Sequence, residues 1–66
     1  MQIFLNGEPR QLDAAATITE LLASEGYANR RVAVEVNQAI VPRSAHDSHR
    51  LVDGDRVEVV TAFGGG

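Results

Sequence analysis

The chain has 66 residues, a formal net charge of −3 and an apolar content of 44%. A domain of this size buries only about 60% of the surface that its unfolded chain exposes, so we expect one small core without room for a deep enzyme pocket. The basic residues are six scattered arginines, which form no basic stripe and argue against a nucleic-acid partner. The absence of cysteine excludes disulfides, thiolate metal sites and cysteine nucleophiles. With neither a charged leader nor a long apolar run at the N-terminus, we expect a cytoplasmic protein that does not enter membranes.

The C-terminus ends in three glycines, Gly64, Gly65 and Gly66, and this end is the predicted reactive site. An α-carboxylate is ionised at neutral pH and is therefore a nucleophile for a phosphate. A segment of glycines has no Cβ atoms, so it can pass through a channel that is too narrow for other residues. We expect residues 1–62 to form the folded domain and residues 63–66 to form a flexible tail, with an expression scar as the alternative explanation.

The first strands are predicted to form a hairpin. Residues 2–5 alternate between apolar and polar side chains, as a half-buried strand does. Asn6 and Gly7 suit a type I′ turn, because both central residues of that turn need positive φ. Residues 8–12 then return as a second strand. Pro9 lacks a backbone N–H, which predicts that this strand lies at an edge of the sheet.

A short helix is predicted to follow. Thr17 and Glu20 have the spacing of a capping box, in which each side chain accepts a bond from the other residue's backbone N–H. Gly26 ends the helix, because glycine adopts the left-handed conformation at C′ without steric cost. One apolar stripe is expected to face the core: Ile18, Leu21 and Leu22.

The second half of the chain is predicted to contain three more strands. Residues 32–36 alternate with valines facing inward, and residues 39–41 form a short strand that ends before a proline. Residues 44–50 are polar and irregular, with room for one helical turn. A tight turn at residues 53–55 leads into a final strand at residues 56–61. The order of elements predicts an α+β domain with one helix packed on one face of a sheet.

Two clusters contain residue types that bind metal ions. His46 and His49 flank Asp47, but a structural zinc site takes four ligands and a catalytic one three, so two solvated loop histidines are the better interpretation. Asp53 and Asp55 fall short of the six to eight oxygens that calcium requires, and a turn explains them. We therefore expect no metal.

Three apolar residues are candidates for docking a partner protein. By alternation, Phe4 and Val60 point away from the helix-covered face, and Phe63 adjoins the tail. Scattered exposed apolar side chains are normal, whereas a cluster of them forms an interaction patch. Periodicity leaves open whether the strands that carry them are neighbours.

The chain resembles the ThiS family of sulfur carrier proteins, which has the ubiquitin-like β-grasp fold. The segments that carry the resemblance span nearly the whole chain: residues 6–8 (Asn-Gly-Glu), 32–37 (Val-Ala-Val-Glu-Val-Asn), 40–44 (Ile-Val-Pro-Arg-Ser), 53–58 (Asp-Gly-Asp-Arg-Val-Glu) and the terminal glycines. The chain departs from the family at residues 45–49, where an aromatic residue is frequent. The resemblance implies a mixed sheet of four to five strands with one helix on one face.

The resemblance also implies a function in thiamine biosynthesis. A ThiF-like adenylyltransferase would use ATP to adenylylate the Gly66 carboxylate while Gly64 and Gly65 thread its active site. A cysteine desulfurase or a related persulfide protein would supply sulfur for a thiocarboxylate, and a ThiG-like thiazole synthase would accept it. The chain itself would be a carrier that binds no cofactor and is not an enzyme. Two alternatives are a molybdopterin synthase small-subunit-like carrier and a non-covalent β-grasp interaction module.

Overall fold

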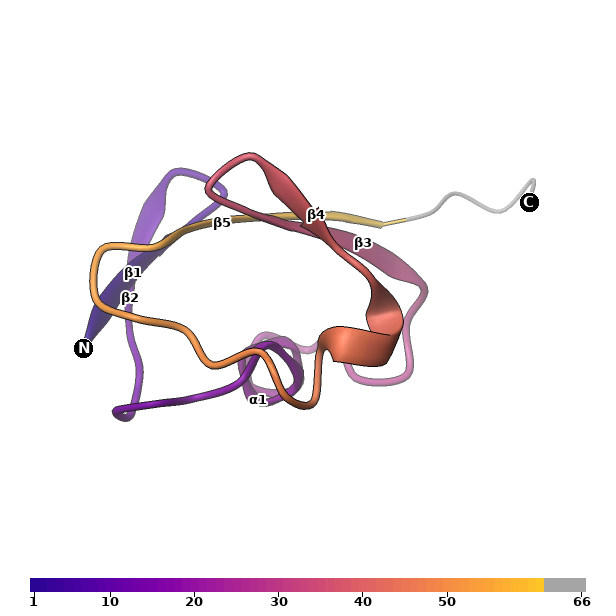
Figure 1. Ribbon diagram of the computed structural model, residues 1–66, viewed down its shortest axis with the longest axis horizontal. Coiled ribbons are helices and arrows are strands. Elements are labelled where there is room, and N and C mark those ends of the chain that lie inside the picture. The colour runs from indigo at the N-terminus through magenta and orange to yellow at the C-terminus, as the bar shows by residue number, and fades with distance from the viewer. Residues whose placement is uncertain (62–66) are drawn as a thin grey trace.

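The computed structural model describes residues 1–61, which form a five-stranded sheet covered on one face by a helix (Figure 1). In chain order the elements are β1 (Gln2–Leu5), β2 (Glu8–Gln11), α1 (Ile18–Ser24), β3 (Val32–Val36), β4 (Ala39–Val41), the 3₁₀ helix η1 (Arg43–Ala45) and β5 (Arg56–Thr61). The strand order is β2-β1-β5-β3-β4. Only the β1–β5 pair is parallel, so the sheet is mixed. The predicted α+β architecture is confirmed.

The β1–β2 hairpin forms where the sequence predicted it. Asn6 and Gly7 have φ angles of 50° and 86°, as a type I′ turn requires. β2 lies at the edge of the sheet, which fits Pro9. The strand ends one residue before the predicted limit, although Met1 and Leu12 still exchange backbone hydrogen bonds of 2.8 and 2.9 Å.

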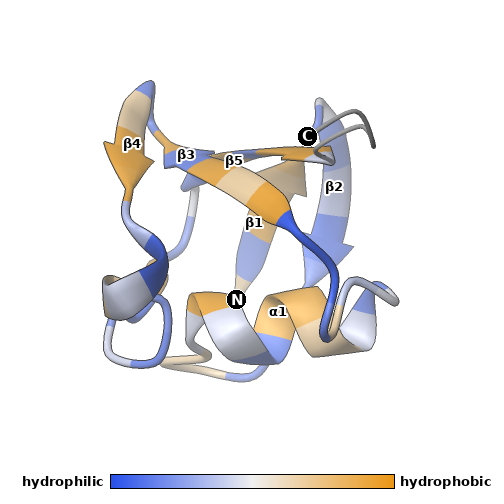
Figure 2. Cartoon of the chain, turned by 90° about the vertical axis from the view of Figure 1, so that its right-hand side faces the viewer, coloured by the Kyte–Doolittle hydropathy of each residue, from blue (hydrophilic) through white to orange (hydrophobic). Residues whose placement is uncertain are grey.

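The core fills the space between α1 and the sheet, where hydrophobic segments of both face each other (Figure 2). The inward alternation predicted for β3 and β5 is observed, with Val32 only partly buried at the margin. Leu51 is 1% exposed although it follows an irregular segment, so periodicity did not identify it. The core residues are Ile3, Leu5, Ile18, Leu21, Leu22, Val34, Val36, Val41, Leu51, Val57 and Val59.

None of the helices in residues 1–61 has the length and apolar character needed to cross a membrane.

Candidate functional site

β5, the strand that leads toward the C-terminal glycines, occupies the centre of the sheet. It pairs with β3 over five residue pairs, from Val32 with Thr61 to Val36 with Val57, and runs parallel to β1 on its other side. A strand held on both sides is a rigid base for the residues that follow it. Residues 62–66 lie outside the described residues, so the roles of Phe63 and the three terminal glycines remain predictions.

The turn before β5 is held by its two aspartates, as expected for a structural turn. Gly54 has a φ of 88°, a conformation that favours glycine. Asp53 Oδ1 accepts a 2.8 Å hydrogen bond from the backbone N–H of Gln2. Asp55 is buried, and its two carboxylate oxygens accept 2.9 Å bonds from the Asn37 side chain and the Val52 backbone N–H. Three of the four carboxylate oxygens thus accept hydrogen bonds that hold the turn between Leu51 and β5.

Two asparagines in other turns also hold β5 in place. Asn6 Oδ1 accepts a 2.9 Å hydrogen bond from the Val59 N–H, and Asn37 Oδ1 accepts a 3.0 Å bond from the Arg56 N–H. Both asparagines have positive φ, a conformation that asparagine tolerates better than most residues. The sequence predicts the turn at Asn6, but it does not predict the contact of either asparagine with β5. A turn signal identifies the local conformation, whereas the distant partner depends on the strand order.

The docking candidates Phe4 and Val60 lie on the sheet face opposite α1, on neighbouring strands. Phe4 pairs with Arg56, whose guanidinium carbon lies 5.7 Å from the centre of the Phe4 ring. Val60 is 62% exposed and lies four residues further along β5, or about 13 Å at the usual rise per residue. The residue between them that points the same way is Glu58. The two apolar side chains therefore share a face but are separated along the strand by charged residues.

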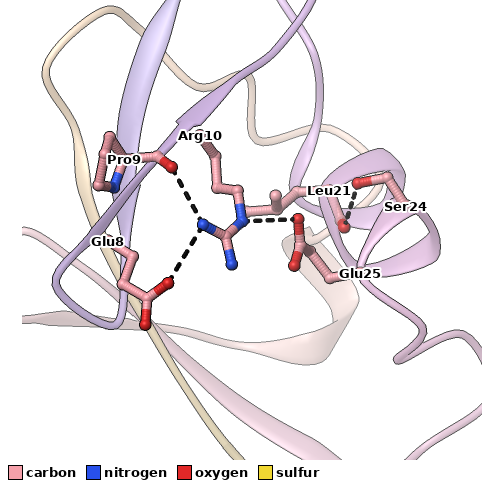
Figure 3. Close-up of polar contacts among 6 residues, drawn as sticks. All are labelled: Glu8, Pro9, Arg10, Leu21, Ser24 and Glu25. Atoms are coloured by element: carbon pink, nitrogen blue, oxygen red, sulfur yellow. Dashed lines mark hydrogen bonds and ion pairs between the residues drawn. The ribbon is translucent and has the colours of Figure 1, made fainter.

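The edge strand β2 is tied to the end of α1 by an arginine (Figure 3). Arg10 Nε lies 3.1 Å from Glu25 Oε2, and its Nη1 lies 3.5 Å from Glu8 Oε1 and 3.0 Å from the Pro9 carbonyl oxygen. These contacts are partly exposed, and an ion pair of this kind contributes at most about 1 kcal/mol. We assign this cluster a structural role.

The structure corrects the interpretation of His46 as a solvated residue. His46 is 7% exposed, and its Nε2 lies 3.1 Å from the Val41 carbonyl oxygen. The turn at η1 directs the ring inward beside a hollow of about 310 Å³ next to α1. His49 is partly buried, and Asp47 instead accepts a hydrogen bond from the Thr19 hydroxyl. Within residues 1–61 no three potential metal ligands gather at one place.

Comparison with known proteins identifies the family. The ThiS family model matches residues 3–66, which is nearly the full length of the chain. The chain therefore belongs to the ThiS family. A crystal structure of the thiamine biosynthesis protein ThiS from Geobacter metallireducens superimposes with a TM-score of 0.84, with 36% identity and full coverage of both chains. This likeness confirms the β-grasp fold that the resemblance implied.

Relatives of the ThiS family occur at two lengths. The sulfur carrier protein ThiS of Escherichia coli is 35% identical to this chain over 66 residues, and each protein covers all of the other. A thiazole synthase of Paramagnetospirillum magneticum is 42% identical over the same length, and one of Magnetococcus marinus is 44% identical. The chain spans about a fifth of the length of these two thiazole synthases. A ThiS-like segment is thus part of each of these longer proteins.

Proposed function

We propose that this chain is a sulfur carrier protein of thiamine biosynthesis whose C-terminal Gly66 carboxylate carries the sulfur. The observation that carries the proposal is the match to the ThiS family over residues 3–66, which includes the terminal glycines. Support also comes from E. coli ThiS, a sulfur carrier protein that this chain matches from end to end. The family match favours this function over the molybdopterin alternative and over a simple interaction module.

The chemistry proceeds in two stages on the same carboxyl carbon. A Gly66 carboxylate oxygen attacks the α-phosphate of ATP on a ThiF-like adenylyltransferase, and pyrophosphate leaves. The terminal sulfur of a persulfide, provided by a cysteine desulfurase or a related protein, attacks the acyl-adenylate, and AMP leaves. A thiol of the donor then cleaves the sulfur–sulfur bond, which releases the thiocarboxylate and leaves a disulfide on the donor. The carboxylate needs this activation because its oxygen is a poor leaving group, and cations of the partner stabilise the developing charge.

The proposal assigns the chain the role of a co-substrate rather than an enzyme. ATP binds to the adenylyltransferase and not to the carrier. A ThiG-like thiazole synthase accepts the sulfur, and the thiazole synthases that contain a ThiS-like segment support this choice of acceptor. Because activation consumes ATP, we place the carrier in the cytoplasm together with its activating enzyme. Residues 63–66 carry the carboxylate to the partner, with Gly64 and Gly65 inside the partner's channel.

The test changes the tail and leaves the folded domain intact. The two variants are Gly65→Val and a chain with one residue added after Gly66. Valine restricts the backbone and adds a branched side chain. The extra residue displaces the carboxylate by up to about 3.6 Å, whereas attack requires reacting atoms within roughly 3–3.5 Å. We expect both variants to retain the stability of the unmodified chain within about 0.5 kcal/mol and to form almost no thiocarboxylate.

The measurement is intact mass after incubation with ATP, the adenylyltransferase and the sulfur donor, beside a melting curve for each protein. The unmodified chain should gain the mass of one oxygen-to-sulfur exchange. Normal thiocarboxylate yield from both variants, or none from the unmodified chain, would refute the proposed function.

A further inference from the structure

Two glutamates oppose each other directly on the open face of the sheet. Glu35 of β3 and Glu58 of β5 are register partners in an antiparallel pair, so their side chains point to the same side, away from α1. Directly opposed residues have Cβ atoms about 4.5–5.5 Å apart, and like charges at that spacing destabilise a sheet. Glu35 is also partly buried, which reduces its hydration. The fold therefore tolerates an unfavourable contact between its two central antiparallel strands.

No basic side chain within residues 1–61 neutralises this pair. The ion pairs of the described residues join Arg10 to Glu8 and to Glu25, on the side of the sheet that faces α1. Arg56 is two residues from Glu58 on the same strand face, but its guanidinium group lies over the Phe4 ring. Neither Glu35 nor Glu58 accepts a side-chain hydrogen bond from the described residues. Their charge is available to a partner.

Exposed apolar side chains flank the two glutamates. Ile40 of β4 pairs with Glu35 and is 75% exposed. Val60 follows Glu58 on the same face of β5 and is 62% exposed, opposite Ala33. Two acidic side chains thus lie between two exposed apolar ones, and Glu58 and Val60 belong to the strand that leads to the tail. Glu58 is about 10 Å from Thr61 at the end of that strand.

We propose that Glu35 and Glu58, together with Ile40 and Val60, form a docking surface for a basic residue of the adenylyltransferase. This inference rests on the proposed function. That enzyme must hold the triphosphate of ATP and the tail carboxylate in one site, so its entrance requires a positive potential. The glutamates complement such an entrance, and Glu58 lies on β5, the strand that leads to the tail. A nucleic acid or an anionic membrane would be repelled. An arrangement of side chains that lowers stability is expected at a binding site, where it strengthens the interaction with the partner.

The experiment uses Glu35→Gln, Glu58→Gln and the double variant in the full-length chain. Removal of either charge relieves the repulsion, so each single variant should melt about 1–4 °C higher than the unmodified chain. The second substitution should raise the melting temperature little further, because the first has already removed the repulsion between the two charges. The affinity for the adenylyltransferase should change in the opposite direction, with a loss of about tenfold in the double variant at low salt.

The control is Asp13→Asn, which removes one negative charge from an exposed residue between β2 and α1, outside the strands that carry the glutamate pair. It should retain the affinity of the unmodified chain. Dissociation constants are measured by calorimetry at two salt concentrations, and the double variant should show the weaker salt dependence. Excess adenylyltransferase should restore its thiocarboxylate yield, because the tail is unchanged.

The docking inference is overturned if the double variant binds the adenylyltransferase with unchanged affinity and salt dependence while the unmodified chain still forms thiocarboxylate. That result leaves the proposed function intact. A loss of affinity for thiazole synthase alone would also overturn the choice of partner. If the unmodified chain is never activated, the proposed function and the docking inference fail together.

Discussion

Single polar residues connect the loops of this small fold to its central strand. Asp55 is 7% exposed, and its carboxylate joins the Asn37 side chain to the Val52 backbone N–H. Asn37 in turn accepts a bond from Arg56 at the start of β5. A hydrogen bond to a charged group contributes about 1.5–3 kcal/mol, more than a bond between two neutral groups. The hydrogen bonds of Asp55 and Asn37 therefore stabilise the fold more than the bonds of exposed residues in the same turns do.

Asp55→Ala is predicted to reduce the free energy of unfolding by about 1–3 kcal/mol, since it removes the charged acceptor of two hydrogen bonds. Asp53→Ala is the matched control: Asp53 is exposed and accepts a single backbone bond, so its loss should cost about 1 kcal/mol or less. Urea denaturation of both variants provides the comparison. Equal losses at the two positions would show that burial of Asp55 does not set the cost.

At the scale of elements, the stability of α1 depends on the hydrogen bonds at its two ends. The helix has seven residues, fewer than an isolated helix needs for stability in water. At its start, the Glu20 N–H donates to Thr17 Oγ1 at 3.1 Å and the Thr17 N–H donates to Glu20 Oε1 at 2.8 Å. At its end, Gly26 has a φ of 84° and Tyr27 N–H donates to the Leu22 carbonyl at 2.8 Å, the bond of a Schellman motif.

Thr17→Ala is predicted to destabilise the protein by about 1 kcal/mol, because the capping hydroxyl is lost. In a domain of this size that corresponds to a decrease in melting temperature of about 4–8 °C. Thr17→Ser keeps the hydroxyl and should recover most of the loss. If serine is as damaging as alanine in thermal melts, the methyl group of this buried threonine matters more than the cap.

The sequence predicted the elements that have a periodic pattern or a cap. The hairpin turn, the capping box and the alternation of β3 and β5 all depend on near neighbours in the chain, so local rules suffice. His46 and Leu51 escaped prediction because they lie in or beside an irregular segment without a period. Their burial depends on how that segment folds over α1, which no local pattern encodes. The docking face could be predicted in outline, but not its pairing of Glu35 with Glu58, since register is a property of the sheet.

At the scale of the whole molecule, the sheet has one covered and one open face. α1 and the loops cover one side (Figures 1 and 2). The strand registers place Phe4, Val60 and the glutamate pair on the other side. Of the two apolar docking candidates within residues 1–61, Phe4 is partly buried beside Arg56, whereas Val60 is largely exposed. Val60 is therefore the better position at which to separate docking from folding.

Val60→Thr is predicted to weaken binding to the adenylyltransferase about three- to tenfold, because a hydroxyl replaces a methyl group in an apolar contact. Stability should change by no more than about 0.5 kcal/mol at this exposed, β-branched position. Val52→Thr is the matched control, since Val52 is 61% exposed and lies before the opposite end of β5. Titration calorimetry and thermal melts of both variants test the prediction, which fails if the two variants bind equally well.

The central position of β5 also has a consequence for the newly made protein. β5 alone joins the β1–β2 hairpin to the β3–β4 hairpin, and an isolated two-stranded hairpin is at best marginally stable. The ribosome adds about 5–20 residues per second, so both hairpins emerge before the strand that unites them. The sheet closes only after β5 leaves the exit tunnel, when the glycines that follow it are already made. A partner that recognises the folded sheet should therefore meet only chains in which the glycines of the proposed activation site have already been made.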